Sequence, residues 1–416
     1  MADTSDIIII GGGVIGVCSA YYLAEGGAQV TLIEQGEIAA GSSYGNAGIV
    51  VPSHSVPLAA PGALADGLKW MLDPQSPFYV RPRFDADLWA WILRFGLASR
   101  VGPMRRGIPI LRDLSLASTI LYKELAALDS LSFDYEQRGM MMVYKTEQGL
   151  HHGADEARLL GEFDLRADVL GAAQAHQMEP ALRENVIGGI FFPQDAHLNP
   201  AKFVRGLAER IEKRGVKIHT DTEVLGFATD GKRITAVQTT RGEFRAKQVI
   251  IAAGSWSPVV GRDLRLKIPV QAAKGYSLTV PRPKTSPSIP LILGEARVAV
   301  TPMGDLLRFA GTLELAGLDL SINRRRVDAI ARAAKEYLRV GDITPTEIWR
   351  GLRPCTPDGL PIIGRTRAFE NLILATGHAM LGMSLGPITG KLVAQVANNT
   401  KPDIDLHPLR LERFGG

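Results

Sequence analysis

The segment DIIIIGGGVIGVCSAYYLAEGGAQVTLIE, which runs from Asp6 to Glu34, decides the fold of this chain. Four consecutive isoleucines end at a glycine, and this pattern predicts a buried parallel strand over residues 6–10. Residues 14–25 predict a helix that a pair of glycines ends, and residues 29–34 predict a second strand. Strand, turn, helix and strand in about 30 residues indicate one βαβ unit.

The turn inside this unit has the pattern G-x-G-x-x-G, with glycines at Gly11, Gly13 and Gly16. The first glycine permits the tight exit from the strand, the second lets the backbone approach a pyrophosphate, and the third lets helix and strand pack closely. Glu34 ends the second strand, where an acid hydrogen-bonds ribose hydroxyls and disfavours a 2′-phosphate. Because strand, helix and acid all stand in the required places, we interpret the turn as a dinucleotide site rather than an empty turn, and we do not expect NADP.

NAD and FAD share this pattern, so the cofactor must be decided elsewhere. The segment AGSSYGNAG at residues 40–48 follows the second strand. Its small, hydroxylated and glycine residues can supply backbone and hydroxyl donors to a cofactor that extends past the first strands. Its composition also fits a flexible surface loop. We interpret it as part of an FAD site, and a plain NAD dehydrogenase remains the weaker alternative.

The overall composition limits the class of protein. The 416 residues favour two lobes over one core. With 46% hydrophobic and 22% charged residues, the chain has the composition of a globular protein. The net charge of +4, without a long basic run, argues against a nucleic-acid partner. We see no signal peptide, no run of about 20 apolar residues and no disulfide framework, since Cys18 and Cys355 are the two cysteines. We therefore expect a cytoplasmic protein, soluble or peripheral on the inner face of the cell membrane.

Farther along, helix-like and strand-like segments alternate. Residues 58–130 read as helical, and residues 199–214 predict an amphipathic helix. Strands are predicted at residues 133–144, 216–219, 234–239 and 248–252, and several short strands with one charged helix near 324–339 are predicted between 265 and 350. We expect an α/β fold in which a Rossmann-like lobe is interrupted by an α+β lobe built on a mixed sheet. No metal site is predicted.

Several further motifs accompany the glycine-rich turn and the 42–48 loop. They are DAHLNP at 195–200, AAGSWS at 252–257, KGYS at 274–277, GTLE at 311–314, WRGLRP at 349–354, TPDGLPIIG at 356–364, TGH at 376–378 and GPITG at 386–390. Together they cover nearly the whole chain, and the sequence resembles the D-amino-acid oxidase superfamily of FAD enzymes. That superfamily includes glycine oxidase, sarcosine oxidase and bacterial D-amino-acid dehydrogenases. The segment SHSVP at 53–57 most resembles the dehydrogenase branch.

The resemblance implies a division into domains and a set of cofactor residues. Residues 1–83, 150–262 and 345–416 would form the FAD-binding domain, and residues 84–149 and 263–344 the substrate-binding domain. The predicted cofactor residues are Gly11, Gly13, Val14, Ile15, Gly16, Glu34, Gln35, Ser42, Ser43, Asn46, Ala47, Gly48, Val224, Ala253, Gly254, Leu381, Gly382 and Met383. The last three open a C-terminal helix whose positive end would face the flavin. FAD is expected to be non-covalent, because Cys355 lies too close to Asp358 for the attachment pattern of some relatives.

The resemblance also implies the substrate site. The arginine of the Arg-Pro motif, Arg353, would hold a planar substrate carboxylate with two parallel hydrogen bonds. Tyr276 would hydrogen-bond the carboxylate or cap the pocket, and Lys274 would lie near the flavin ring or merely face solvent. His54 and His378 are neighbours of the active site in one interpretation and structural histidines in the other. No side-chain base is required, because positioning carries most of the catalysis.

The implied reaction is oxidation of a D-amino acid, a cyclic one such as D-proline included, to the imino acid by hydride transfer to flavin N5. A glycine- or sarcosine-type amine oxidase and a non-catalytic flavoprotein subunit are the alternatives. Electrons would pass to a quinone or an artificial acceptor. Residues 84–106 combine Trp89, Trp91, Leu93 and Phe95 with arginines, which indicates either an interfacial helix or a helix that covers the active site.

Overall fold

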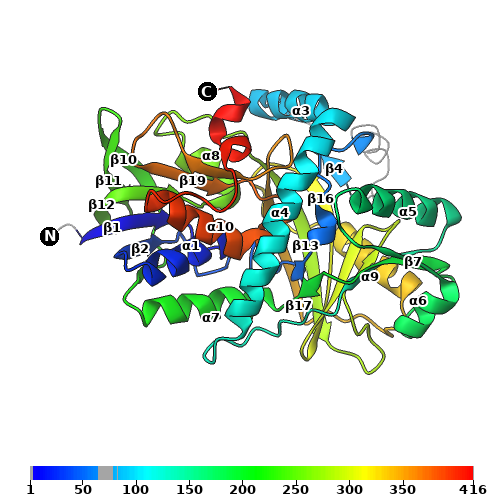
Figure 1. Ribbon diagram of the computed structural model, residues 1–416. Coiled ribbons are helices and arrows are strands. Elements are labelled where there is room, and N and C mark those ends of the chain that lie inside the picture. The colour runs from blue at the N-terminus through cyan, green and yellow to red at the C-terminus, as the bar shows by residue number, and fades with distance from the viewer. Residues whose placement is uncertain (1–2, 64–77, 82, 416) are drawn as a thin grey trace.

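The computed structural model describes residues 3–63, 78–81 and 83–415. Two large sheets lie side by side, and helices pack around both of them (Figure 1). Among the described residues, no helix has both the length and the apolar character needed to cross a membrane.

The first sheet contains the glycine-rich turn. Its strands are β1 (Asp3–Ile10), β2 (Val30–Ile33), β9 (Lys217–His219), β10 (Val224–Asp230), β11 (Arg233–Thr239), β12 (Gly242–Ile251), β18 (Ile362–Arg365) and β19 (Leu372–Thr376). They run in the order β10-β11-β12-β1-β2-β9, and β19 pairs with β12 and β18. β1 pairs in parallel with β2 and β12, β2 with β9, and β12 with β19. This parallel core confirms the predicted βαβ unit and the Rossmann-like fold.

The isoleucine run of β1 is buried on both faces of this sheet. Ile7 and Ile9 pack toward the helices, whereas Ile8 and Ile10 pack into a separate core on the opposite face. Successive side chains of a strand point to opposite faces, so a strand covered on both sides needs a continuous apolar run.

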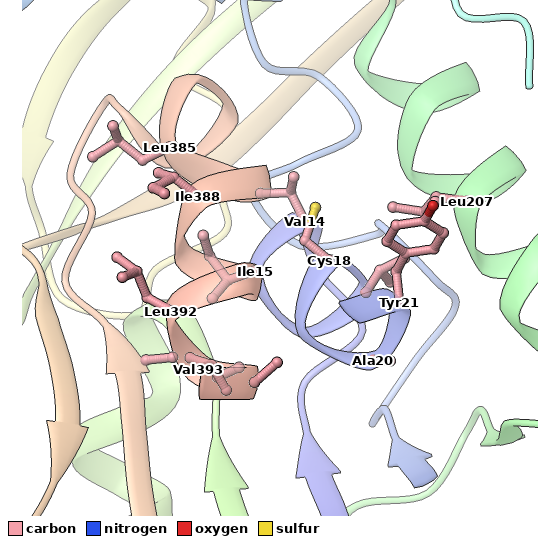
Figure 2. Close-up of a cluster of buried hydrophobic side chains, with 14 of the residues drawn as sticks. Val14, Ile15, Cys18, Ala20, Tyr21, Leu207, Leu385, Ile388, Leu392 and Val393 are labelled. Carbon is pink, nitrogen blue, oxygen red and sulfur yellow. The ribbon is translucent and has the colours of Figure 1, made fainter. Parts of the chain in front are cut away.

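Four helices cover the Ile7 and Ile9 face. They are α1 (Val14–Glu25), α4 (Val101–Ala126), α7 (Pro200–Glu212) and α10 (Gly382–Ala397). Figure 2 shows α1 between α10 and α7, with Cys18 and Val14 directed toward α10 and Tyr21 beside Leu207. A Cβ on Gly390 would lie 2.5 Å from the backbone of Cys18. The glycine therefore permits the close approach of α1 and α10.

The second sheet is larger and mixed. Its strands are β4 (Phe78–Val80), β5 (Met140–Tyr144), β6 (Asp168–Gly171), β7 (Gly188–Phe192), β13 (Gln271–Pro281), β14 (Leu291–Leu293), β15 (Val298–Met303), β16 (Leu306–Leu315) and β17 (Glu347–Cys355). They run in the order β17-β13-β16-β15-β14-β5-β7-β6, and β4 pairs with β16. One face packs on α9 (Arg324–Tyr337). Part of the other face packs on α3 (Ala86–Ala98), where Trp91 and Phe95 contact Ala273 and Cys355.

The remaining elements lie along the chain between the strands of the two sheets or after the last strand. They are α5 (Glu147–Gly161), α6 (Ala172–Met178), α8 (Ser257–Val260), the two-stranded pair β3 (Ile49–Val50) and β8 (Ala196–His197), and the 3-10 helices η1 (Pro52–His54), η2 (Gly254–Trp256), η3 (His407–Leu409) and η4 (Leu411–Phe414). The strand predicted at 133–144 is shorter, because only Met140–Tyr144 pairs within the second sheet.

The sheets divide the chain differently from the predicted domain boundaries. Residues 150–262 and 345–416 were assigned to the FAD-binding domain, yet β6, β7 and β17 belong to the second sheet. Conversely, α4 lies within the predicted substrate-binding segment 84–149 but packs in the core of the first sheet, through Leu111, Leu114 and Leu125. The chain therefore passes between the two sheets at other positions than the pattern of motifs indicates.

Candidate active site

The glycine-rich turn has the conformation that the sequence predicts. Gly11 has φ +115°, and a Cβ there would lie 2.5 Å from Ala252 O. A Cβ on Gly16 would lie 1.8 Å from Gly11 O, so the turn and α1 touch. Gly13 caps α1, and the nearest atom that a Cβ would meet there is Ser43 Oγ at 3.4 Å. This leaves room beside Gly13 at the positive end of α1, whose first turn contains Val14 and Ile15.

Glu34 lies beside this turn at the end of β2. Its Oε2 accepts a hydrogen bond from Gly12 N at 2.6 Å, and its Oε1 accepts one from Gly36 N at 3.0 Å. The next residue, Gln35, is exposed. Thr222 N donates to the backbone carbonyl of Glu34 at 2.9 Å, so the start of β10, with Val224, lies close to the end of β2.

The 42–48 loop connects the turn to the second sheet. Ser43 Oγ accepts a hydrogen bond from Val14 N at 2.9 Å, and Ser42 Oγ donates one to Leu352 O. Asn46 Oδ1 accepts one from Gly48 N at 2.8 Å, and the half-buried Ala47 lies between them. Gly48 has φ +72° and lies against Leu198 O. The loop therefore touches both α1 and β17.

Ala253 and Gly254 follow the carboxyl end of β12, at the edge of the sheet where Gly11 leaves β1. Gly254 O accepts a hydrogen bond from Thr376 Oγ1 at 3.1 Å. Ser255 Oγ donates to Leu352 O at 2.9 Å, so the same β17 carbonyl receives hydroxyls from Ser42 and from Ser255.

The N-terminus of α10 completes this edge. Leu381 caps the helix, and Gly382 and Met383 form its first turn. The first N–H groups of a helix lack intrahelical acceptors and carry the positive end of the dipole. Ser384 Oγ donates to Ile49 O at 3.1 Å and accepts from Val51 N at 3.0 Å, which fixes the segment before η1 against this turn.

Arg353 lies on β17, close to the N-terminus of α10. Pro354 O accepts a hydrogen bond from Ala379 N at 2.8 Å, which ties the end of β17 to the turn before α10. Arg353 Nη1 donates to Thr312 O at 2.7 Å, and its guanidinium lies over Gly275. Burial lowers the pKa of Arg353. In the described part of the chain, no carboxylate lies within 4.0 Å of this guanidinium, so the cation is available to an anionic ligand.

Lys274 and Tyr276 lie on the opposite face of the same sheet. Arg353 is paired with Ala273, and neighbouring residues on a strand alternate between faces. Lys274 Nζ lies 2.9 Å from Asp319 Oδ2 and 3.6 Å from Glu314 Oε2, and Tyr276 OH donates to Glu314 Oε1 at 3.1 Å. Both side chains are buried beside α9. The pleat of β13 thus turns both side chains away from the Arg353 face, where Tyr276 was expected to bind the carboxylate or cap the pocket, and Lys274 does not face solvent. Both belong instead to an internal polar cluster with Glu314 and Asp319.

His54 ends η1, three residues after the Val51 contact with α10. Its Nδ1 lies 3.0 Å from Ser53 Oγ, and a 2.5 Å hydrogen bond joins Ser53 Oγ to Asp195 Oδ2. Burial lowers the pKa of His54 to about 4, with Arg297 contributing, and burial raises the pKa of Asp195 to about 8 against the effect of Ser53. At neutral pH, both ends of this hydrogen-bonded chain are therefore uncharged. His378 is also buried, with Nε2 3.0 Å from Thr389 Oγ1.

Sequence reasoning assigned no role to four side chains that build this region: Ser53, Asp195 and Ser255, which lie within the quoted motifs, and Arg308. Arg308 donates to two carbonyls of the 42–48 loop. The signal for it was a lone arginine inside the apolar strand LLRFAG at 306–311, since a buried charge requires partners. Within the described residues, no group of three or more His, Cys, Asp or Glu is arranged to hold a metal.

The residues present fit FAD. The open side of Gly13 and the positive end of α1 suit a pyrophosphate, and the carboxylate of Glu34 suits a ribose. The N-terminus of α10 and the cationic Arg353 lie farther along the same edge. This arrangement offers an extended edge of positive potential with the guanidinium of Arg353 at its far end.

Comparison with known proteins identifies the family and agrees with FAD as the cofactor. The family model described as DAO, FAD dependent oxidoreductase, matches residues 6–396. The chain is 33% identical over 417 residues to a D-amino acid dehydrogenase of Granulibacter bethesdensis, with 99% of this chain and 100% of that protein covered. It is 34% identical to a D-amino acid dehydrogenase of Methylobacterium radiotolerans, with 98% and 99% covered. The structure of glycine oxidase from Geobacillus kaustophilus has a TM-score of 0.82 at 22% identity over the full length of both chains, a likeness of fold.

Proposed function

The chain belongs to the DAO family of FAD-dependent oxidoreductases, and from this premise we propose that it is a D-amino-acid dehydrogenase that converts its substrate to the imino acid. Full-length similarity to proteins named D-amino acid dehydrogenase supports this substrate class. The imino acid from an open-chain substrate hydrolyses to a 2-oxo acid and ammonia, whereas a cyclic substrate of the D-proline kind keeps the imine in its ring.

The observation that carries the proposal is the guanidinium of Arg353. One of its terminal nitrogens is held by Thr312 O, which fixes the plane of the group. A carboxylate can bind such a plane with two parallel hydrogen bonds. Because this guanidinium is largely removed from water and no described carboxylate neutralises it, the α-carboxylate of an amino acid is a fitting partner.

The N-terminus of α10, Arg353 and His54 orient the substrate and determine which groups can exchange a proton with it. FAD, when bound, accepts the hydride that leaves the substrate α-carbon. The first-turn N–H groups of α10 present positive potential on the cofactor side, and Arg353 holds the carboxylate at the end of the same edge. His54 stays neutral at physiological pH because burial lowers its pKa to about 4, so it has no acidic proton to give to a neutral substrate amine.

Replacing Arg353 tests this role. Arg353→Met should raise the dissociation constant for the amino acid at least about 100-fold, because a charged hydrogen-bonding pair is lost, while dithionite still reduces the bound FAD. The matched control is Arg350→Met, since Arg350 lies on the same strand but on the opposite face, where its Nε donates to Leu320 O. Unchanged substrate affinity in Arg353→Met would contradict the assignment.

A substrate panel tests the class of reaction. The purified protein is mixed anaerobically with D-amino acids, L-amino acids, glycine, sarcosine and both enantiomers of proline, and the flavin absorbance is followed. Bleaching with D-amino acids supports the proposal and ranks the side chains. Bleaching with glycine or sarcosine alone would favour the amine-oxidase alternative, and a yellow protein that no amine bleaches would indicate a non-catalytic subunit.

FAD is proposed to bind without a covalent bond to Cys355. This thiol is fully buried beside Trp91 and Ala273, and burial raises its pKa to about 12. A thiol kept neutral in this way is a poor nucleophile. Acid precipitation should leave the yellow colour in the supernatant, and colour in the pellet would contradict non-covalent binding.

For the electron acceptor, we propose a quinone reached through peripheral membrane contact. Trp91 and Phe95, which the sequence grouped with the interfacial residues, are buried. However, Trp89, Leu93 and Leu97 follow one another at four-residue spacing on the exposed side of α3. The helix also bears the exposed Arg94 and is followed by the exposed Arg100 and Arg106, and such a basic apolar surface suits anionic lipid.

Vesicle flotation tests this contact. The protein should float with vesicles that contain anionic lipid, and Leu93→Asp should abolish flotation. The control is Leu225→Asp, because Leu225 is comparably exposed but lies on β10 of the first sheet. Failure of the unaltered protein to float, or equal loss in both variants, would refute the proposed surface.

A further inference from the structure

Arg308 joins the second sheet to the 42–48 loop. It lies in the middle of β16 and is only 4% exposed. Its Nε donates to Thr279 Oγ1 on the neighbouring strand at 3.1 Å. Its Nη1 leaves the sheet and donates to Tyr44 O and to Asn46 O, both at 3.0 Å. A buried guanidinium without such partners would be costly, so the loop carbonyls are part of its environment.

Further contacts hold the same part of the 42–48 loop against the second sheet. A Cβ on Gly45 would lie 2.1 Å from Trp349 Cδ2, so the glycine lets the loop lie directly on the indole. Glu347 Oε2 lies 3.9 Å from Arg308 Nη2, and burial and contact with Glu347 raise the pKa of Tyr44. Three consecutive loop residues, 44–46, are therefore held by β16 and β17.

The direction of the loop peptides follows from these bonds. A trans peptide places its N–H opposite its C=O. The carbonyls of Tyr44 and Asn46 point toward Arg308 in the second sheet. The N–H groups of Gly45 and Ala47 consequently point away from Arg308, and the neighbouring Ser43 joins the same loop to Val14 at the start of α1.

We propose that Arg308 is a positioning residue for FAD: it binds the Tyr44 and Asn46 carbonyls and thereby turns the Gly45 and Ala47 N–H groups toward the cofactor. The residue acts on FAD through the loop. Binding of FAD is in this way coupled to the contact between the two sheets. The inference depends on FAD as the cofactor and is independent of which amine is oxidised.

The test compares two buried arginines. Arg308→Met removes both loop contacts. Arg326→Met is the matched control, because Arg326 is also 4% exposed and its Nε lies 2.9 Å from Glu314 Oε1 on the α9 face of the sheet. For each variant, FAD is removed, and its dissociation constant, visible spectrum and effect on the melting temperature are measured by titration.

We expect Arg308→Met to weaken FAD binding at least about tenfold, since two loop carbonyls lose a charged donor, and to blur the vibrational shoulder of the flavin spectrum. Arg326→Met should lower the melting temperature with FAD affinity within about threefold of the unaltered protein. Equal FAD affinity in Arg308→Met and the unaltered protein would overturn the proposal, as would equal losses of affinity in both variants.

Two further variants keep the test decisive if Arg308→Met does not fold. Arg308→Lys keeps the positive charge, but a single ammonium group replaces the planar guanidinium that binds two carbonyls. Its FAD affinity should therefore lie between those of Arg308→Met and the unaltered protein. Gly45→Ala perturbs the same contact through a different residue, since a methyl group would force the loop off Trp349, and it should weaken FAD binding while leaving Arg308 in place. FAD affinity equal to that of the unaltered protein in both variants would refute the proposed role.

Discussion

The buried carboxyl of Asp195 should make the stability of this protein fall as pH rises, and Asp195→Asn should remove that fall. Asp195 is fully buried, and burial raises its pKa to about 8, whereas an unfolded chain returns it to 3.8. Between these values the folded state holds one proton more than the unfolded state. Each pH unit in that window therefore costs about 1.4 kcal/mol of folding free energy.

From pH 5 to pH 7, the loss in the unaltered protein amounts to about 3 kcal/mol from this group alone. Asparagine resembles the protonated acid: its amide oxygen can accept from Ser53 N, and its amide nitrogen can donate to Ser53 Oγ. We therefore expect Asp195→Asn to match the unaltered protein below pH 3.8, to exceed its stability by about 2 kcal/mol at pH 5, and to exceed it by about 4 kcal/mol at pH 7.

The assay is reversible urea unfolding at pH 5, 6 and 7 with FAD in excess. Asp319→Asn is the control. The pKa of Asp319 is lowered to about 2 by Ser321 N and by Lys274, so its contribution is complete above 3.8 and constant from pH 5 to 7. A stability difference between Asp195→Asn and the unaltered protein that stays flat across this range would refute the reasoning.

Three more substitutions test separate features. Glu34→Gln replaces the carboxylate that accepts from Gly12 N, and we expect FAD affinity, measured by fluorescence titration, to fall about tenfold because charged acceptors bind more strongly. Gly390→Ala would place a methyl group 2.5 Å from the backbone of Cys18; chemical denaturation should show a loss of about 1–3 kcal/mol as α10 shifts from α1, and an unchanged midpoint would contradict the close packing. Thr301→Val removes a buried hydroxyl that has no described hydrogen-bond partner, so calorimetry should find the variant as stable as the unaltered protein or about 1 kcal/mol more stable.

The parts of the fold that local sequence determines were predictable. The predicted helix at 14–25 coincides with α1, and the strands on either side are β1 and β2. Apolar runs, glycines and an acid at fixed spacing specify these elements without help from distant residues. The strand predicted at 133–144 was too long, because pairing with β7 and β14, and not composition, determines where β5 begins.

The side chains that depend on pairing between distant strands were harder to place. The motif KGYS predicts residues near the flavin, but the side of β13 that faces the cofactor depends on its register with β17. That register puts Gly275 beside Arg353 and sends Lys274 and Tyr276 to α9. Arg308 was missed for a related reason, since its acceptors lie more than 260 positions away in the chain.

The backbone of β17 explains why the cofactor and substrate sites must form together. Leu352 O accepts hydroxyls from the 42–48 loop and from η2, and two residues later Pro354 O binds the turn before α10. The guanidinium of Arg353 is carried by the residue between these two anchors. Any displacement of the 42–48 loop or of α10 therefore moves the guanidinium of Arg353 as well. Hydride transfer requires the reacting atoms to lie within a few tenths of an ångström of their productive positions. Because β17 is bound to the first sheet on both sides of Arg353, the substrate carboxylate is held at a fixed distance from the cofactor.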